Sequence, residues 1–203
     1  PNGSLGFGDI GLALLDAPGV SWEFLSEASA ELAPAQIEPY DGLLVLGPRV
    51  SAATLMGNTR LFIVARFGVG YDNVDVPACT AAGVALTITP DGVRRPVAVA
   101  ALTLLLACTH KLLIKDRLTR EGKWGEKLAH MGMGVTARTL GVIGLGNIGR
   151  EILRLAEPLG MRHIGHDPFP GDAIPGCERV SLEQLLREAD YVVIACALTS
   201  ETH

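Results

Sequence analysis

The stretch that decides the fold reads Leu140-Gly141-Val142-Ile143-Gly144-Leu145-Gly146-Asn147-Ile148-Gly149. Its glycines follow the spacing G-x-G-x-x-G, directly after an apolar strand and at the start of a helix expected to run to about Leu159. Gly144 permits a tight turn, Gly146 lets the backbone approach a pyrophosphate, and Gly149 lets helix and strand pack closely. The helix N-terminus then offers free N–H groups and a partial positive charge to phosphates.

An acidic residue follows the next strand. We expect that strand at His163 to His166, and Asp167 comes directly after it, about 18 residues past Gly149. A carboxylate in this place can accept hydrogen bonds from both hydroxyls of an adenosine ribose. It favours NAD over NADP, because a 2′-phosphate would face a like charge, although a protonated His166 would soften that preference. Strand, turn, helix, strand and acid together predict a Rossmann dinucleotide-binding unit.

Two other interpretations of the turn stay open. It can be a tight turn in an α/β sheet, with Asp167 as a solvated strand cap. An S-adenosylmethionine-dependent methyltransferase can present a similar turn and acid, but three glycines in this register and the helix from Asn147 to Leu159 suit a pyrophosphate better. The cofactor-binding residues predicted here are Gly144, Leu145, Gly146, Asn147, Ile148, Gly149, Asp167 and Pro168.

Apolar runs and helical spacing also alternate in the first half of the chain. The runs are Leu43 to Leu46, Leu61 to Ala65 and Val84 to Ile88, which we interpret as strands buried on both faces. Segments with helical spacing lie between them, at Ser51 to Met56 and Val76 to Ala82. This order favours an α/β fold, with crossover helices and a parallel sheet.

A segment rich in proline, glycine and arginine separates the two halves. Pro90 to Pro96 interrupts the alternation and is interpreted as a domain boundary, with a long helix after it at about Val97 to Arg120. The fold class is therefore α/β with two doubly wound parallel-sheet domains, residues 1–91 and residues 92–203. The last elements expected are a helix at Leu182 to Glu188 and a strand at Tyr191 to Cys196.

Composition and charge exclude several classes of partner. The 203 residues carry a net charge of −5 without a run of Lys and Arg, so we expect no nucleic acid partner. The most apolar stretch, Val97 to Cys108, falls short of the ~20 residues that cross a bilayer, and the start at Pro1-Asn2-Gly3-Ser4 lacks the regions of a signal peptide. Four scattered cysteines favour buried thiols in a reducing compartment. We expect a cytoplasmic protein that binds neither a metal nor a membrane.

Two further stretches accompany the glycine turn. They are Arg66-Phe67-Gly68-Val69-Gly70-Tyr71-Asp72-Asn73-Val74-Asp75 and Cys196-Ala197-Leu198-Thr199-Ser200-Glu201-Thr202. In this order and spacing, the three stretches resemble the family of D-isomer-specific 2-hydroxyacid dehydrogenases, which contains phosphoglycerate, glyoxylate/hydroxypyruvate and formate dehydrogenases. The resemblance covers nearly the whole chain. It implies a flavodoxin-like substrate domain, a Rossmann NAD-binding domain, NAD as cofactor and a small 2-hydroxy or 2-oxo acid as substrate.

The resemblance also implies roles for individual residues. The N–H groups of Val69 and Gly70 would bind the substrate carboxylate, which suits a glycine-flanked turn after a buried strand. A turn in which Asp72 and Asn73 cap the next helix is compatible with that role. Cofactor contacts on the adenosine and pyrophosphate side are implied for Ala197, Leu198, Thr199 and Thr202. Thr199 fits a strand-end cap equally well.

The chain departs from the family pattern at three places. Val97-Ala98-Val99 stands where the family usually has V-A-E, and Arg94 stands where it has a small or polar residue near the nicotinamide. Ala197 follows Cys196 where the family usually has proline. These changes leave the cofactor site intact and affect the substrate pocket.

The groups that the family uses for hydride transfer have no match in this chain. One cation must hold the carboxylate and polarise the carbonyl, and one acid must protonate the alkoxide. In the family these are an Arg and a His supported by a Glu, all beyond residue 203. We expect no catalytic residue here, and a chain incomplete at both ends, without the first strand of such a domain. The histidines present, for which we expect structural or exposed roles, are His110, His130, His163, His166 and His203.

Three functions remain open on this basis. The leading one is an NAD-dependent D-2-hydroxyacid dehydrogenase. The second is a non-catalytic NAD-sensing or interaction protein on the same scaffold, as the related corepressors are, and the third is a formate- or phosphite-type dehydrogenase. The charged segment after His110, with Trp124, is interpreted as the contact of a homodimer, as in the family, or as a loop packed on its own domain.

Overall fold

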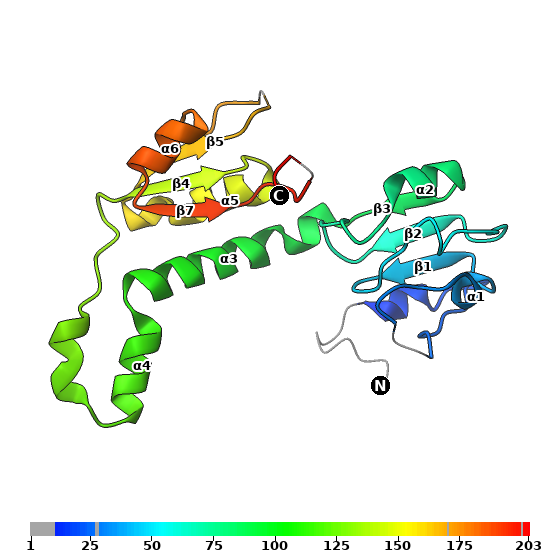
Figure 1. The fold of residues 1–203 in the computed structure, drawn as a ribbon, viewed down its shortest axis with the longest axis horizontal. Coiled ribbons are helices and arrows are strands. Elements are labelled where there is room, and N and C mark those ends of the chain that lie inside the picture. The colour runs from blue at the N-terminus through cyan, green and yellow to red at the C-terminus, as the bar shows by residue number, and fades with distance from the viewer. Residues whose placement is uncertain (1–10, 27–28, 170, 200) are drawn as a thin grey trace. The chain divides into compact units, whose positions relative to one another are not determined.

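The structure is a computed structural model that describes residues 11–26, 29–169, 171–199 and 201–203. The described residues form two compact units. The first contains residues up to Ala65 together with Asn73–Thr87, and the second contains Arg66–Asp72 together with Ile88–His203. Each unit has its own sheet and its own buried core (Figure 1). The start at Pro1 to Ser4 and Ser200 of the third motif lie outside the described residues.

The first unit contains a three-stranded sheet in the order β1-β2-β3. β2 and β3 are parallel, with Ile63 opposite Ala85. Asp75 begins α2, because its side chain accepts the N–H of Ala78 at 2.9 Å, and a proline in the first turn costs no hydrogen bond. The elements of this part of the chain are η1 (Leu12–Leu15), α1 (Pro34–Ile37), β1 (Gly42–Val45), β2 (Ile63–Arg66), α2 (Val76–Ala81) and β3 (Ala85–Thr87).

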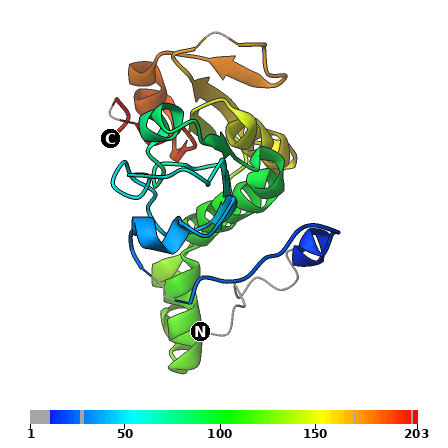
Figure 2. The same cartoon turned by 90° about the vertical axis from the view of Figure 1, so that its right-hand side faces the viewer.

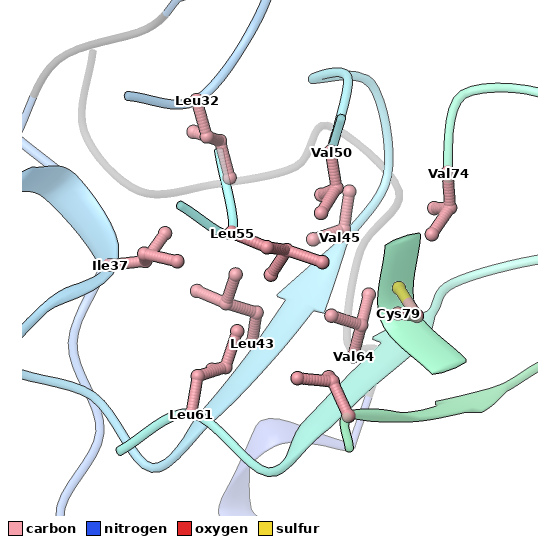
Figure 3. Close-up of a cluster of buried hydrophobic side chains, with 11 residues drawn as sticks. Leu32, Ile37, Leu43, Val45, Val50, Leu55, Leu61, Val64, Val74 and Cys79 are labelled. Atoms are coloured by element: carbon pink, nitrogen blue, oxygen red, sulfur yellow. The ribbon is translucent and has the colours of Figure 1, made fainter. Parts of the chain in front are cut away.

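Apolar side chains gather on one face of this sheet and form the core of the first unit. Leu43 and Val45 of β1 point toward Leu55, and Val64 of β2 lies beside Cys79 of α2 (Figure 3). Removal of this apolar surface from water is the main stabilising contribution to the unit. The buried members are Leu32, Ile37, Leu43, Val45, Val50, Leu55, Leu61, Val64, Val74, Cys79 and Val84.

Two expectations for the first unit are wrong. The strands are not all buried on both faces: Leu44 of β1 is 51% exposed although its neighbours along the strand are buried, and Ala85 and Thr87 of β3 are exposed. The segment from Ser51 to Met56 forms turns and not a helix. The Ser51 hydroxyl accepts the N–H groups of Ala53 and Thr54, and such local bonds compete with helical pairing.

The second unit opens with α3 (Pro90–Thr109), which begins earlier than expected. The segment interpreted as a boundary is its first two turns, and the helix does not begin at Val97. Pro90 is tolerated at the first helical position, where an N–H has no intrahelical partner in any case. Pro96 lies inside the helix and lacks the N–H that would bond the Gly92 carbonyl. The predicted domain boundary after residue 91 stays a prediction.

The helix expected to reach Arg120 is broken near its middle. Lys111 adopts φ 51, a left-handed conformation that ends α3, and α4 (Leu112–Arg120) follows. After α4 comes the 3₁₀ segment η2 (Trp124–His130). The hairpin of α4 and η2 stands apart from the four-stranded sheet of the same unit (Figures 1 and 2). Leu118 of α4 is buried, whereas Leu113, Trp124 and Leu128 of the hairpin are exposed.

By length and composition alone, α3 meets the criteria for a membrane-spanning helix, with 20 residues and a mean hydropathy of 1.4. The helix is longer than the apolar stretch from Val97 to Cys108, which was expected to be too short to cross a bilayer. Core helices of water-soluble proteins meet the same criteria. Two residues of α3, Ala98 and Leu105, are buried in the core of the second unit, and 17% of its apolar stretch is buried overall.

Four parallel strands form the sheet of the second unit, in the order β6-β5-β4-β7. Leu140 of the central β4 lies opposite His163 of β5 and Tyr191 of β7. The parallel strands and their crossover helices confirm the expected α/β class. Except for β6, the elements agree closely with the sequence prediction: β4 (Thr139–Ile143), α5 (Asn147–Ala156), η3 (Glu157–Leu159), β5 (Arg162–His166), β6 (Cys177–Arg179), α6 (Leu182–Glu188) and β7 (Tyr191–Ile194).

α5 and α6 cover opposite faces of this sheet (Figure 1). A Cβ on Gly149 of α5 would lie 3.2 Å from the Val142 side chain, and one on Gly141 would lie 2.8 Å from Leu185 of α6. Neighbouring strand residues point to opposite faces, which separates the two helices. The core between α3, α5 and the sheet consists of Ala98, Leu105, Leu140, Val142, Leu145, Ile152, Leu153, Ala156 and Met161.

His163 makes the stability of the second unit depend on pH. It is 7% exposed, and its Nε2 has no hydrogen-bond partner among the described residues. Burial lowers the pKa of His163 from its ordinary value of 6.5, and the nearby charge of Glu157 opposes this only in part. Below that pH the unfolded chain binds a proton that the folded chain does not, so stability falls as pH falls.

We therefore expect the free energy of unfolding, measured with urea, to decrease between about pH 7 and about pH 5. His163→Leu should remove this part of the decrease, because neither state then binds the proton. His110→Gln, which changes an exposed histidine of the same unit, should keep it. An unchanged slope in His163→Leu would show that this side chain does not carry the effect.

Candidate dinucleotide-binding site

The turn after β4 contains two positions that only glycine can occupy. Gly144 has φ 94, and a Cβ there would lie 2.5 Å from the backbone nitrogen of Cys196. A Cβ on Gly149 would collide with the Gly144 carbonyl oxygen. Positive φ and close backbone approach both select glycine. Gly146 differs from them, because a Cβ at this position would enter open space.

α5 begins directly after this turn. Gly146 is its N-cap residue, and no side chain caps the helix. The N–H groups of Asn147, Ile148 and Gly149 therefore have no acceptor within the helix. Gly146 and Asn147 are exposed. Uncapped N–H groups at the positive end of a helix dipole suit a bound anion such as a phosphate.

Asp167 lies beside this turn, one residue after β5. Its Oδ2 accepts the Leu145 N–H at 2.7 Å, and its Oδ1 accepts the Phe169 N–H at 3.0 Å. Burial raises the pKa of Asp167, but these two hydrogen bonds and the charges of Arg179 and His166 outweigh burial and hold the pKa below its usual value. The carboxylate is therefore ionised at neutral pH, and its lone pairs leave room for further donors.

The turn, the helix start and the acid together fit a dinucleotide. Open space at Gly146 admits a group close to the backbone, and Asp167 retains acceptors for ribose hydroxyls. Leu145 cannot contact a dinucleotide in the way expected of the other predicted residues. Its N–H bonds Asp167 and its side chain is buried, so that N–H is not available to a phosphate. Pro168 is exposed, in the middle of the short turn that the Phe169 N–H closes.

Two threonines hold the loop that follows β7. The Thr202 hydroxyl donates to the Ala197 carbonyl at 2.6 Å and accepts the Thr199 N–H at 2.8 Å. Such bonds are typical of a turn stabilised by hydroxyl side chains, as the cap interpretation of Thr199 requires. The loop begins at Cys196, next to the glycine turn. Its exposed members include Ala197, Leu198 and Thr199.

The run after β2 presents free backbone N–H groups. Gly68 donates its N–H to the Thr89 hydroxyl at 2.9 Å, and its carbonyl accepts the Thr89 N–H at 2.9 Å. These bonds fix the turn from both sides. Within the described part of the chain, the N–H groups of Val69 and Gly70 have no hydrogen-bond acceptor. They can therefore donate to an anion such as a carboxylate.

The alternative interpretation, in which Asp72 and Asn73 cap the helix after this run, is wrong. Asp75 is the N-cap residue of α2, so Asp72 and Asn73 do not cap it. Asn73 instead donates its side-chain amide to the Pro48 carbonyl at 2.8 Å. Capping of α2 therefore does not explain the Asp72-Asn73 pair.

Two of the departures from the family pattern lie on the surface of α3. The side chain of Arg94 is 45% exposed and pairs with Asp91 at 3.2 Å. Val99 is 48% exposed. Neither side chain belongs to the buried core of the unit, so these departures do not disturb its packing.

Sequence reasoning missed two arginines beside Asp167. Arg150 donates its Nε to the Leu145 carbonyl at 2.9 Å, and Arg179 donates Nη1 to the Phe169 carbonyl at 3.1 Å. The only signal for Arg150 was its place directly after the third glycine. Arg179 gave no signal, because it lies on β6, a strand that the hydrophobic pattern did not reveal.

Among the described residues, the other histidines and the cysteines do not gather into a second cluster. Nδ1 of His166 lies 3.1 Å from the Val180 carbonyl. The described residues contain no group of three or more His, Cys, Asp or Glu side chains that could hold a metal ion. All four cysteines are free thiols, but the expectation that they are buried is wrong for Cys108, which is exposed, whereas Cys79 is buried. The exposed or partly exposed histidines include His110, His130 and His203.

Comparison with known proteins connects these features to one family. The family described as D-isomer specific 2-hydroxyacid dehydrogenase, NAD binding domain, matches residues 102–203. The glyoxylate reductase of Thermococcus onnurineus is 35% identical over 192 residues, which cover 90% of this chain and 58% of that protein. The hydroxypyruvate reductase of Thermotoga maritima is 36% identical over 154 residues, which cover 76% of this chain and 50% of that protein.

Solved structures show the same fold. The crystal structure of a glyoxylate reductase from Paecilomyes thermophila matches with a TM-score of 0.74 at 27% identity, covering 82% of this chain and 53% of that one. This chain thus spans only a little more than half the length of such relatives. The family match covers the glycine turn, Asp167 and the loop after β7. The chain therefore belongs to the family of D-isomer specific 2-hydroxyacid dehydrogenases.

Proposed function

We propose that the protein is an NAD-dependent oxidoreductase that interconverts a small D-2-hydroxy acid and its 2-oxo acid by hydride transfer. The observation that carries this proposal is the joint placement of an uncapped helix start, an open Gly146 and an ionised Asp167. Further support comes from the family and from relatives named glyoxylate reductase and hydroxypyruvate reductase. When bound, NAD supplies the nicotinamide carbon that takes up the hydride.

In this proposal the chain contributes the cofactor site. The N–H groups of Asn147 and Ile148 hold the pyrophosphate, and Asp167 accepts hydrogen bonds from the adenosine ribose. The carboxylate of Asp167 selects NAD, because it repels the 2′-phosphate of NADP. The loop with Ala197, Leu198, Thr199 and Thr202 lines the adenosine and pyrophosphate side.

The same proposal gives the run after β2 a role in substrate binding. The free N–H groups of Val69 and Gly70 hold the carboxylate of the substrate. Family resemblance assigns carbonyl polarisation to an Arg, and proton transfer to a His supported by a Glu, after residue 203. The substrate is therefore a small acid with an oxygen on the carbon next to its carboxylate.

A substrate panel tests this function. The natural full-length protein should oxidise NADH when glyoxylate, hydroxypyruvate or another small 2-oxo acid is added, as followed by the absorbance of the reduced nicotinamide. Formate with NAD serves as the test of the alternative reaction. Tight NAD binding without turnover of any acid in the panel would instead support the sensing protein.

We also propose the domain division and the location expected from the sequence. Residues 1–91 would form the substrate domain and residues 92–203 the NAD-binding domain. The family match at residues 102–203 lies within the second of these. The four free thiols support a reducing compartment, the cytoplasm.

We further propose that the hairpin of α4 and η2 joins two copies in a homodimer. Leu113 is 81% exposed, and Leu128 is 73% exposed. Trp124 is 62% exposed beside a hollow of about 350 Å³. Apolar surface gathered in this way on one element marks a protein interface.

The double substitution Leu113→Glu and Leu128→Glu should weaken the dimer by about a hundredfold or more, because two charges would be buried in the interface. Size-exclusion chromatography with light scattering at several concentrations measures this change. Leu14→Glu, at an 87% exposed leucine of the first unit, is the matched control and should leave the dimer intact. A wild-type protein that is monomeric throughout would contradict this interface.

A further inference from the structure

The two groups that bind Asp167 are themselves held by arginines. The Leu145 N–H donates to Asp167, and the carbonyl of the same residue accepts Arg150 Nε at 2.9 Å. The Phe169 N–H donates to the other carboxylate oxygen, and the carbonyl of that residue accepts Arg179 Nη1 at 3.1 Å. Each residue that binds the acid through its N–H is thus fixed by an arginine through its C=O.

The two guanidinium groups also approach a common stretch of the loop after β5. Arg150 donates Nη2 to the Asp172 carbonyl at 3.3 Å. A Cβ on Gly171 would lie 3.1 Å from Arg179 Nη2 and 3.4 Å from Arg150 Nη2. On β6, Arg179 lies opposite Gly165, two residues before the acid. Both arginines therefore reach the loop of Asp167 from elements outside it.

This arrangement leaves the carboxylate both oriented and available. Asp167 uses one acceptor position on each oxygen for the backbone, while an ionised carboxylate offers about four such positions. The remaining positions suit the neighbouring hydroxyls of a ribose. Neither arginine forms an ion pair with Asp167 among the described interactions, so the carboxylate is not neutralised by direct contact.

We propose that Arg150 and Arg179 are positioning residues, which hold the turn and the loop so that Asp167 faces the adenosine ribose and rejects a 2′-phosphate. This inference rests on the proposed dinucleotide function. It assigns part of the NAD selectivity to two side chains that do not touch the cofactor. Arg150 holds the Leu145 carbonyl from α5, and Arg179 holds the Phe169 carbonyl from β6.

The experiment measures Kd for NAD and for NADP by calorimetry on the natural full-length protein and its variants. Arg150→Ala and Arg179→Ala should each raise Kd for NAD about tenfold, because Asp167 loses its fixed orientation. Kd for NADP should change much less, so the ratio of the two constants falls. In turnover assays, KM for NAD should rise while kcat stays near the wild-type value, since the hydride-transferring end is not affected.

Lysine variants distinguish how Arg150 and Arg179 each hold their carbonyl partners. Arg179 uses one nitrogen for the Phe169 carbonyl, so Arg179→Lys should retain most of the NAD affinity. Arg150 bonds two carbonyls through Nε and Nη2, which an ammonium group cannot reproduce, so Arg150→Lys should behave like Arg150→Ala. Arg162→Ala is the matched control, because this arginine also bridges two elements, through Glu178 and Glu188.

Each other outcome overturns the inference in a recognisable way. If Kd rises equally for NAD and for NADP and the melting temperature falls, the arginines have a structural role only. If the affinity for NADP falls more than the affinity for NAD, the guanidinium groups contact the 2′-phosphate directly. Unchanged Kd values in variants of a wild-type protein that binds NAD would overturn only the positioning role, whereas a wild-type protein that binds neither nucleotide would overturn the proposed function as well.

Discussion

Replacement of Asp167 by alanine should raise Kd for NAD by about a hundredfold or more. The variant loses charge-assisted hydrogen bonds to the ribose, each worth about 1.5–3 kcal/mol, and every 1.4 kcal/mol changes the affinity about tenfold. It also leaves the N–H groups of Leu145 and Phe169 without their acceptor, so the turn loses support. NADP should bind as well as before or better, because the like charge is gone. Calorimetry with both nucleotides measures the two effects together.

The matched control for this change is Glu183→Ala. Glu183 is an exposed carboxylate of α6 whose only described ion pair joins it to Arg187. Its removal should leave both dissociation constants unchanged. Equal NAD affinities in Asp167→Ala and in the wild type would refute the role of Asp167 in ribose binding.

Gly149→Ala should be strongly destabilising, by about 2–4 kcal/mol in the free energy of unfolding. The new methyl group would collide with the Gly144 carbonyl oxygen, and neither atom can rotate away because the backbone fixes the position of both. α5 must then move off β4, which opens the core around Val142. Urea denaturation measures the loss, and the weakened site should bind NAD poorly at any temperature.

Gly146→Ala is the companion to that change and separates folding from binding. Its φ of −73 suits alanine, and the added Cβ meets open space, so stability should stay within about 1 kcal/mol of the wild type. NAD binding should nevertheless weaken, because the methyl group occupies the space through which the pyrophosphate reaches the backbone. Unweakened NAD binding in Gly146→Ala would argue against a phosphate at this turn.

The part of the fold that the sequence predicted well is the part governed by local rules. β4, the glycine turn, α5 and β5 follow from apolar periodicity and from positions that only glycine tolerates. α6 was predicted with its observed limits, because Ser181 caps it and a clear apolar pattern follows. Of the candidate site, the turn and the acid were predicted because both belong to this local pattern.

The sequence predicted less where packing decides the outcome. Proline and glycine at Pro90 to Pro96 indicated a break, yet the segment is helical because Pro90 occupies the first helical position. No local signal marked Lys111, whose left-handed backbone divides the long helix. β6 is three residues long and two of them are charged, so no apolar pattern marks it and its pairing with β5 decides that it is a strand. The bonds of Arg150 and Arg179 appear only after these elements are in place.

The central claim is that the start of α5 holds the phosphates of NAD while Asp167 holds its ribose. An NMR titration of the natural full-length protein with NAD tests this most directly, through the backbone amide signals. We expect large shifts for Gly146, Asn147 and Ile148, and none for Leu113 on the distant hairpin of α4 and η2. Saturable NAD binding that leaves the signals of Gly146, Asn147 and Ile148 in place would contradict the account.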